Sequence, residues 1–167
     1  MSWLVSGIEA QAIGVTARPA SLVREAREAL WAHGIATAAL NGRRSTQAVR
    51  AGTMHAMKGL EFQAVAVIGV EQGLVPEPAA VTPESEDTLT HAQDLQRERC
   101  VLFVACTRAR DHLYVSATGE PSMFLPRSPD GAGSAWTKAS SGPRCSGPRR
   151  MAASVTPVVD SGDGRSR

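Results

Sequence analysis

The sequence predicts an α/β domain with a mainly parallel sheet, on three observations. Short apolar runs alternate with longer amphipathic stretches, the pattern of strands joined by crossover helices. The run AVAVIGV at 64–70 is β-branched and uninterrupted, which is typical of a parallel strand covered on both faces. The chain has 167 residues, enough for one domain with a core of ordinary size.

The first half of the chain is expected to begin this alternation. Residues 12–17 form a short apolar strand, and a helix opens near Pro19 with its apolar residues on one side. Gly34 is expected to end that helix, because glycine suits the left-handed position after a helix. Residues 35–40 and 49–53 are predicted to be the next two strands.

The second half contains the clearest elements. The strand at 64–70 is followed by a proline-rich, acidic loop at 71–87. Apolar residues then recur at helical spacing from Leu89 to Arg110, and residues 112–116 are expected to form a final strand.

Composition divides the chain into three parts. Residues 1–11 are expected to be an N-terminal extension, residues 12–125 the folded domain, and residues 126–167 a disordered tail. Nearly half of the tail is Gly, Pro or Ser, and it has no apolar periodicity to offset the entropy of ordering.

Charge is distributed unevenly between these parts. The tail carries seven Lys or Arg against three Asp, whereas residues 1–125 carry eleven against thirteen acidic residues. A generic basic nucleic-acid binder is therefore excluded for the folded part, and any DNA contact must be local. The arginines of the tail are either solvated charge or an arm that binds DNA.

Cysteine usage and the N-terminus bear on the compartment. Three cysteines argue against a disulfide framework, and Cys100 and Cys106 are expected to be small buried hydrophobes in a reducing environment. No signal peptide and no membrane-spanning run is recognised, so a cytoplasmic location is predicted.

The sequence contains no loop that would wrap a triphosphate. The pattern G-x-x-x-x-G-K-[ST] is absent, and Lys58-Gly59 lacks both the earlier glycine and the following hydroxyl. This chain is therefore not expected to hold and hydrolyse ATP alone. No metal site is predicted either, because the histidines at 33, 91 and 112 lack the spacing of metal ligands.

Two segments carry the residues suited to phosphate chemistry. TMHAMKGLEF at 53–62 places Thr, His, Lys and Glu between two predicted strands. ERCVLFVACTRARDHLYVS at 98–116 runs an apolar helix directly into Arg108 and Arg110. A guanidinium held at the rigid end of a helix is suited to bidentate recognition of phosphate.

These segments resemble motifs of UvrD/Rep-like superfamily 1 DNA helicases. The first is similar to motif V (T-x-H-x-[SA]-K-G-L-E-[FW]) and the second to motif VI (E-E-x-R-L-x-Y-V-A-x-T-R-A). Residues 12–33 resemble the opening of the family's second RecA-like lobe, and the three matches follow the family order. The resemblance covers residues 12–125 and implies a RecA-like domain of the P-loop NTPase type.

The resemblance also implies roles for individual residues. Arg108 resembles the arginine finger that reaches the γ-phosphate of ATP on the other lobe, and Glu61 the carboxylate that contacts the ribose. The implied nucleotide-binding set is Arg108, Glu61 and Gly59, and the implied DNA-binding set is Thr53, His55, Lys58 and Arg18. The implied ligands are ATP with Mg²⁺ in the completed motor, single-stranded DNA, and a first lobe that carries the Walker A loop.

The chain departs from the family pattern in several places. Met57 replaces a small residue of motif V and could crowd the approach of DNA. In motif VI, Arg97 replaces the first Glu, Cys100 the Arg and Phe103 the Tyr. Only residues 41–52 lie where the family usually inserts a large subdomain.

Alternatives remain open at this point. Arg108 is either the finger or a structural arginine paired with Asp111, Glu61 is either a ribose ligand or a solvated residue, and His55 either meets DNA or caps local backbone. For the chain as a whole, the alternatives to a motor lobe are a non-enzymatic remnant of a truncated helicase gene and a binding module without turnover.

Overall fold

The computed structural model describes residues 2–42, 47–126 and 136–137. Within these ranges one sheet has the strand order β2-β3-β1-β4-β5-β6. The strands are β1 (Ile13–Ala17), β2 (Thr37–Ala39), β3 (Val49–Thr53), β4 (Phe62–Val67), β5 (Ala109–Val115) and β6 (Trp136–Thr137). All neighbours pair in parallel except β5 and β6. The predicted α/β fold with a mainly parallel sheet is confirmed.

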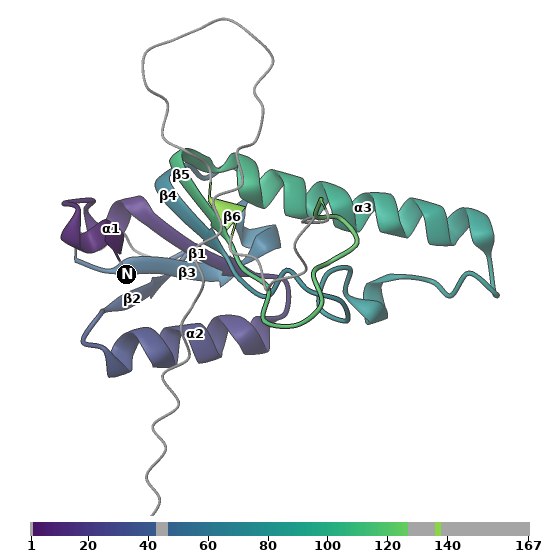
Figure 1. Cartoon of the computed structure of the whole chain (residues 1–167), viewed down its shortest axis with the longest axis horizontal. Coiled ribbons are helices and arrows are strands. Elements are labelled where there is room, and N and C mark those ends of the chain that lie inside the picture. The colour runs from purple at the N-terminus through teal and green to yellow at the C-terminus, as the bar shows by residue number, and fades with distance from the viewer. Residues whose placement is uncertain (1, 43–46, 127–135, 138–167) are drawn as a thin grey trace, which may run out of the picture.

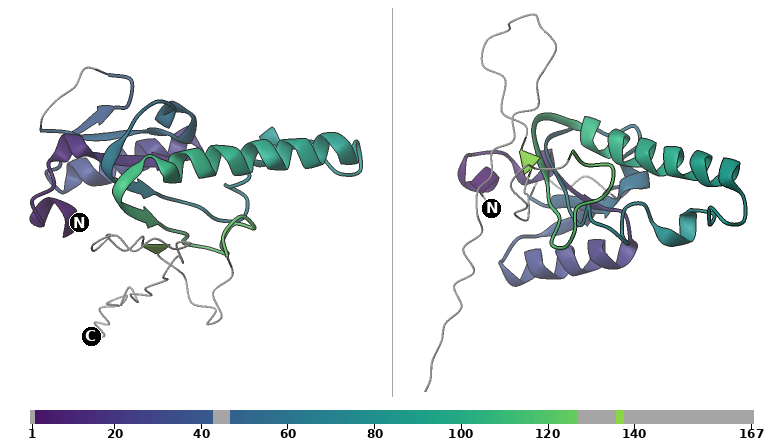
Figure 2. Two further views of the ribbon diagram at one scale, coloured as in Figure 1. Left: turned by 90° about the horizontal axis from the view of Figure 1, so that it is seen from above. Right: turned by 45° about the vertical axis from the view of Figure 1, so that its right-hand side comes forward.

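Two long helices cover the sheet from opposite sides (Figures 1 and 2). They are α2 (Ala20–Ala32) and α3 (Thr88–Thr107), and the shorter helical segments are α1 (Ser2–Val5), η1 (Ala10–Ala12), η2 (Met54–Met57) and η3 (Pro78–Ala80). The first half of α3 extends past the sheet together with the loop that precedes it, as Figure 1 shows.

Alternation along the strands divides the core into two clusters. The α2-side cluster contains Val49 and Ala51 of β3 with Leu30 of α2. The α3-side cluster contains Val65 of β4 with Leu102 of α3. Successive strand residues point to opposite faces, so strands that are apolar throughout can feed both clusters. This explains why the run of apolar residues at β4 was a reliable strand signal.

The boundary between α3 and β5 differs from the prediction. The helix begins at Thr88, where Asp87 accepts hydrogen bonds from the N–H groups of Leu89 and Thr90, but it ends at Thr107 rather than at Arg110. The carbonyl of Arg108 already accepts a hydrogen bond from the N–H of Phe62 at 2.9 Å. Pairing with β4 therefore ends the helix earlier than the spacing of apolar residues predicts, and Arg108 is the single residue between α3 and β5.

Residues near both ends of the chain contact the folded domain. Ile8 is buried, and Trp3 and Leu4 pack against the α2-side cluster, so the N-terminal segment adds to the core. Most of the tail predicted to be disordered lies outside the described residues, but Trp136–Thr137 forms β6 against β5. A second strand there satisfies backbone groups that the edge of β5 would otherwise leave unpaired.

Cys100 was expected to be buried, and this prediction is wrong, because its position on α3 faces solvent. Cys106, six residues further along, is half-buried, and burial raises the pKa of its thiol to about 11. Both thiols are free. Among the described helices, none has the length and apolar character required to cross a membrane.

Gly69, just after β4, offers a test of this packing. Its φ is +67°, and an added Cβ would overlap the Cδ2 atom of Leu22 on α2. Gly34, which ends α2 as predicted, has a similar φ of +73° but nothing within 4 Å of such an atom. Gly34→Ala should therefore cost only the backbone penalty, about 1–2 kcal/mol in unfolding free energy, and Gly69→Ala should cost more in urea denaturation. Equal losses would show that Leu22 moves aside freely.

Candidate functional site

The two motif-bearing segments connect opposite edges of the sheet. Because β1, β3, β4 and β5 are parallel, their amino ends lie along one side of the sheet, here called the amino edge. Their carboxyl ends lie along the opposite side, here called the carboxyl edge. The segment after Thr53 leaves the carboxyl edge, crosses the α3-side face through η2, and reaches the amino edge at Phe62. Helix α3 runs between the same two edges. Side chains from both segments therefore meet at each edge.

Arg108 lies at the amino edge, half-buried at the end of α3. Its guanidinium donates to three neutral oxygens: Nε to the carbonyl of Val104 at 3.2 Å, Nη1 to that of Leu60 at 3.4 Å, and Nη2 to the hydroxyl of Thr107 at 3.2 Å. Among the described residues, no carboxylate forms an ion pair with Arg108. Its side chain is thus held in place while its charge stays uncompensated.

Glu61 and Gly59 lie beside Arg108, because the carbonyl of Leu60 between them accepts its Nη1–H. Both residues are exposed, and Gly59 has a φ of +76° with open space where a Cβ would be. The three residues predicted to bind nucleotide are therefore neighbours at one edge. Their role in binding stays a prediction.

The neighbouring ion pair does not involve Arg108. Arg110 pairs with Asp111 at 3.1 Å, and both side chains are substantially exposed. The hydrogen bond and charge of Asp111, with a further contribution from Glu61, raise the pKa of Arg110. The alternative in which Arg108 serves as the structural partner of Asp111 is therefore not what the structure contains.

Arg18 lies at the opposite, carboxyl edge in a cluster with Glu77 and Glu98. Its Nε and Nη2 groups donate to the two carboxylate oxygens of Glu98 at 2.9 and 2.8 Å, and its Nη1 lies 2.5 Å from Glu77. The side chain of Arg18 is only 11% exposed and that of Glu98 5%. A contact between Arg18 and DNA stays a prediction, and the structure shows its guanidinium already bound to two carboxylates.

Glu98 is the centre of this cluster. Burial would raise the pKa of its carboxyl group, but hydrogen bonds from Arg18 and from the N–H of Glu77, with the charges of Arg18 and His55, hold the pKa below its ordinary value. The carboxylate therefore stays ionised and ties α3 to β1 and to the loop after β4.

The other residues predicted to bind DNA follow β3. Thr53 pairs in register with Ala17, next to Arg18, and the charge of His55 reaches Glu98. His55 and Lys58 are exposed, and Thr53 is half-buried with no side-chain cap on η2. Thr53 and His55 thus lie near Arg18, whereas Lys58 is further along the crossover toward the amino edge.

Met57 was expected to crowd the approach of DNA, and this prediction is wrong. Its side chain is fully buried in the α3-side cluster, as is that of Met54. Because η2 must pack its apolar side onto the sheet, the larger residue fills the core and leaves His55 and Lys58 on the surface.

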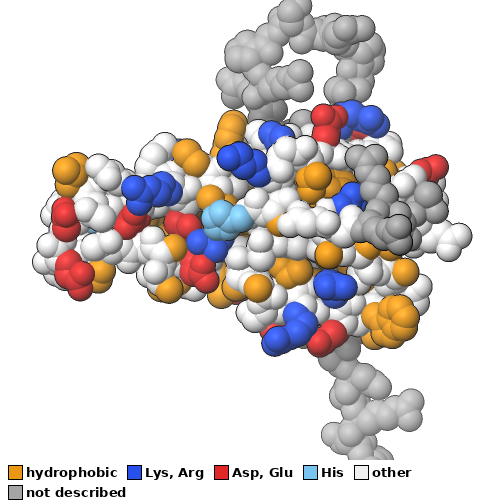
Figure 3. All heavy atoms as spheres, turned by 180° about the vertical axis from the view of Figure 1, so that it is seen from behind, with side chains coloured by type: hydrophobic (Ala, Val, Ile, Leu, Met, Phe, Trp, Pro, Cys, Tyr) orange, Lys and Arg blue, Asp and Glu red, His pale blue; other side chains and the backbone are white. Residues whose placement is uncertain are grey.

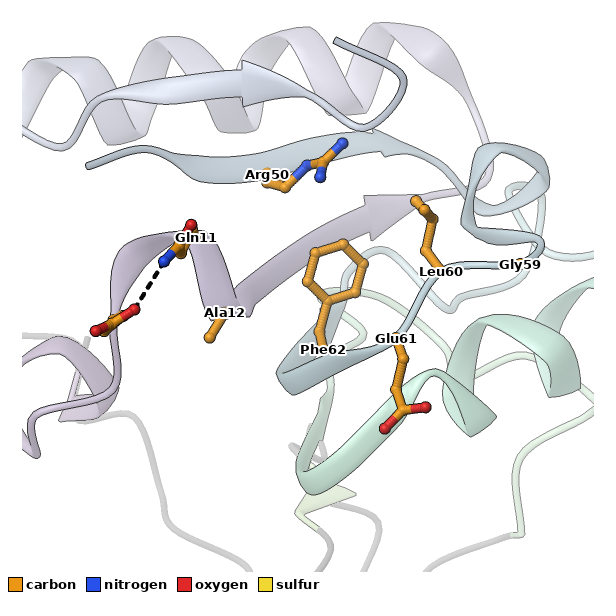
Figure 4. A pocket seen from close by; sticks show the side chains of 8 residues that line it. Gln11, Ala12, Arg50, Gly59, Leu60, Glu61 and Phe62 are labelled. Atoms are coloured by element: carbon orange, nitrogen blue, oxygen red, sulfur yellow. Dashed lines mark hydrogen bonds between the residues drawn. The ribbon is translucent and has the colours of Figure 1, made fainter. Parts of the chain in front are cut away.

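Sequence reasoning missed two charged residues that the structure makes prominent. Glu98 was visible as an acid within an apolar helix, but its partner Arg18 is 80 positions away. Arg50 lies inside β3 between apolar neighbours and is 8% exposed. It lines a cavity of about 470 Å³ at the amino edge, together with residues before β1 and before β4 (Figure 4).

Figure 3 shows how charged side chains are distributed on one face of the molecule. On the face shown in Figure 3, basic and acidic side chains are interspersed among the described residues. Nothing on that face forms a continuous basic strip, so a nucleic-acid contact there would involve few phosphates. Among the described residues, no group of three or more His, Cys, Asp or Glu side chains is arranged to hold a metal ion.

Residues 23–120 match the family model of the UvrD-like helicase C-terminal domain. The match spans more than half of the chain, and the chain belongs to this family.

The chain is also similar in sequence to individual DNA helicases. The chain is 36% identical over 72 residues to the ATP-dependent DNA helicase PcrA of Staphylococcus aureus, covering 43% of this chain and 9% of that protein. It is 34% identical over 89 residues to PcrA of Staphylococcus epidermidis, covering 47% of this chain and 11% of that protein. The chain therefore spans about a tenth of the length of these relatives.

A solved structure shares the fold. The C-terminal domain of a possible DNA helicase from Lactobacillus plantarum superposes with a TM-score of 0.52 at 22% identity, over 75% of this chain and 65% of that one.

Proposed function

We propose that this chain is the second motor lobe of an ATP-dependent DNA helicase or translocase. In this proposal Arg108 is the arginine finger for ATP bound on a first lobe that carries the Walker A loop. The observation that carries the proposal is the state of Arg108: three neutral oxygens orient it, and no described carboxylate neutralises it.

The chemistry of phosphoryl transfer fits such a group. Charge develops on the γ-phosphoryl oxygens in the transition state, and a preoriented guanidinium stabilises it without reorganising. In this proposal Glu61, which is exposed at the same edge, accepts hydrogen bonds from the ribose hydroxyls. ATP and Mg²⁺ would be held chiefly by the first lobe, since this sequence has no phosphate-wrapping loop.

The crossover between β3 and β4 would connect nucleotide to DNA. It carries Thr53 and His55 at the carboxyl edge and Gly59 and Glu61 at the amino edge, with Met54 and Met57 buried between them. A shift of this edge against the first lobe would then move the DNA-facing residues. The direct test is DNA-stimulated ATP hydrolysis by the completed motor, with and without Arg108.

Binding of the isolated chain to single-stranded DNA should be weak, independent of sequence and only shallowly dependent on salt. The folded part is net acidic, so within it we expect only the residues Thr53, His55 and Lys58 to meet phosphates. Each phosphate neutralised contributes a slope of about −0.7 in log K against log salt. Fluorescence anisotropy with an oligothymidine across a salt series measures this slope.

A matched pair of variants localises the contact. Lys58→Ala should weaken binding and reduce the slope by about 0.7. Arg24→Ala removes one charge from the exposed side of α2, on the opposite face, and should change neither. Tight binding that is insensitive to salt, or an equal effect of both variants, would rule out this contact. Binding without any ATP turnover in the completed motor would favour a simple binding module.

A further inference from the structure

Arg50 has no ion-pair partner in the described part of the chain, although its side chain lies within the sheet. The residue is 8% exposed. One Nη2–H donates to the carbonyl of Leu40, and the buried Nε has no hydrogen-bond partner. A buried charge costs free energy unless it is paired, so a site of this kind is suited to a ligand that supplies the missing oxygens.

The same molecule shows what a satisfied guanidinium is like. Arg18 is similarly buried, and its Nε and Nη2 groups bind both oxygens of one carboxylate. At Arg50 no carboxylate of the described residues occupies the equivalent position. Arg18 and Arg50 therefore differ in whether a carboxylate is bound, and not in how deeply they are buried.

The space beside Arg50 is open. Arg50 from β3, the ring of Phe62 from the start of β4 and Ala12 just before β1 all line the cavity of about 470 Å³ (Figure 4). Two acidic residues line the cavity, but neither faces Arg50. Figure 4 shows Glu61 directed away toward α3 and β5, and the carboxylate of Glu9 accepts a hydrogen bond from Gln11 at 2.8 Å.

We infer that this cavity is a binding site for a small oxyanion, a carboxylate or a phosphate group, with Arg50 as its charged ligand. One oxygen binds the side of the Arg50 guanidinium that lines the cavity, and the remainder of the ligand lies over Phe62. The acidic side chains at the rim disfavour a polyanion, so the site selects a ligand with a single compact anionic group. The inference concerns Arg50, which is not part of the proposed nucleotide contact, but the cavity adjoins that contact because Gly59 and Glu61 also line it.

The test is an NMR titration of the arginine Nε–H resonances of the whole chain, with sodium acetate and with inorganic phosphate at constant ionic strength. The Arg50 resonance should shift and saturate at millimolar concentrations, as suits a site with one charge. The Arg18 resonance should stay fixed, because its partners are already in place. Saturation at lower acetate identifies a carboxylate site, and saturation at lower phosphate a phosphate site.

Three variants make the test decisive. Arg50→Met should abolish saturable binding, and Ala12→Leu should weaken it at least about tenfold by filling the cavity while leaving Arg50 in place. If Arg50→Met fails to fold, Ala12→Leu still decides. Arg24→Ala, which changes an exposed residue of α2, should leave the titration unchanged. A shift that only follows ionic strength, no shift at all, or saturable binding that survives in Ala12→Leu would overturn the inference.

Discussion

Replacing Arg108 with alanine should lower DNA-stimulated ATP hydrolysis by the completed motor about 10³–10⁵-fold. At 1.36 kcal/mol per decade, this loss is roughly 4–7 kcal/mol of activation free energy. ATP affinity should change by less than about tenfold, because a finger acts on charge that develops in the transition state. Single-turnover hydrolysis and equilibrium nucleotide binding, measured on the same preparation, separate the two effects.

The controls follow from the contacts at the end of α3. Arg108→Lys should restore little, since an ammonium cannot reproduce a planar guanidinium held by three oxygens. Arg110→Ala should be much milder, because Arg110 is exposed and pairs with Asp111. If Arg108→Ala unfolds the isolated domain, or lowers ATP affinity as much as turnover, the guanidinium is structural and the finger assignment is wrong.

Replacing Glu98 with glutamine should lower the unfolding free energy by about 3 kcal/mol, the low end of the range for a broken buried ion pair. The loss stays at the low end because Glu77 remains on Arg18 and the new amide oxygen can still accept one hydrogen bond. Asp111→Asn breaks an exposed pair and should cost much less than Glu98→Gln. Urea denaturation of the two variants measures both values.

The Glu98 effect should depend on pH in one direction. The pKa of this carboxyl group is lower in the folded protein than in the unfolded chain, so its stabilisation is present above the ordinary value and is lost as pH falls. The difference between wild type and Glu98→Gln should be present at about pH 5 and shrink below about pH 4.3. A difference that grows on acidification would contradict the ionised pair.

The sequence was most informative where local signals and tertiary structure agree. The apolar runs at β1 and β4 and the helix that ends at Gly34 were predictable because strand burial and helix termination depend on neighbouring residues. The end of α3 was misplaced because Ala105 and Ala109 suit both a helix and a strand, and only pairing with β4 decides between them.

The candidate site was predictable in its residues but not in its connections. Motif matching drew attention to Arg108 and Glu61, and the structure makes them neighbours through the carbonyl of Leu60. The sequence motifs could not show that Arg18 is bound to Glu98, because that contact joins residues 80 positions apart. Nor could they show that Met57 faces the core, since a short 3₁₀ segment has no periodicity from which to infer a buried side.

The central claim is that this chain supplies half of an ATP site. The most direct measurement is the rate of ATP hydrolysis, with single-stranded DNA present, by the chain alone and by the chain joined to a Walker-bearing first lobe. We expect no turnover above the uncatalysed background for the chain alone, and DNA-stimulated turnover for the pair. Turnover by the isolated chain that survives a contamination control, or a pair no more active than its first lobe alone, would contradict it.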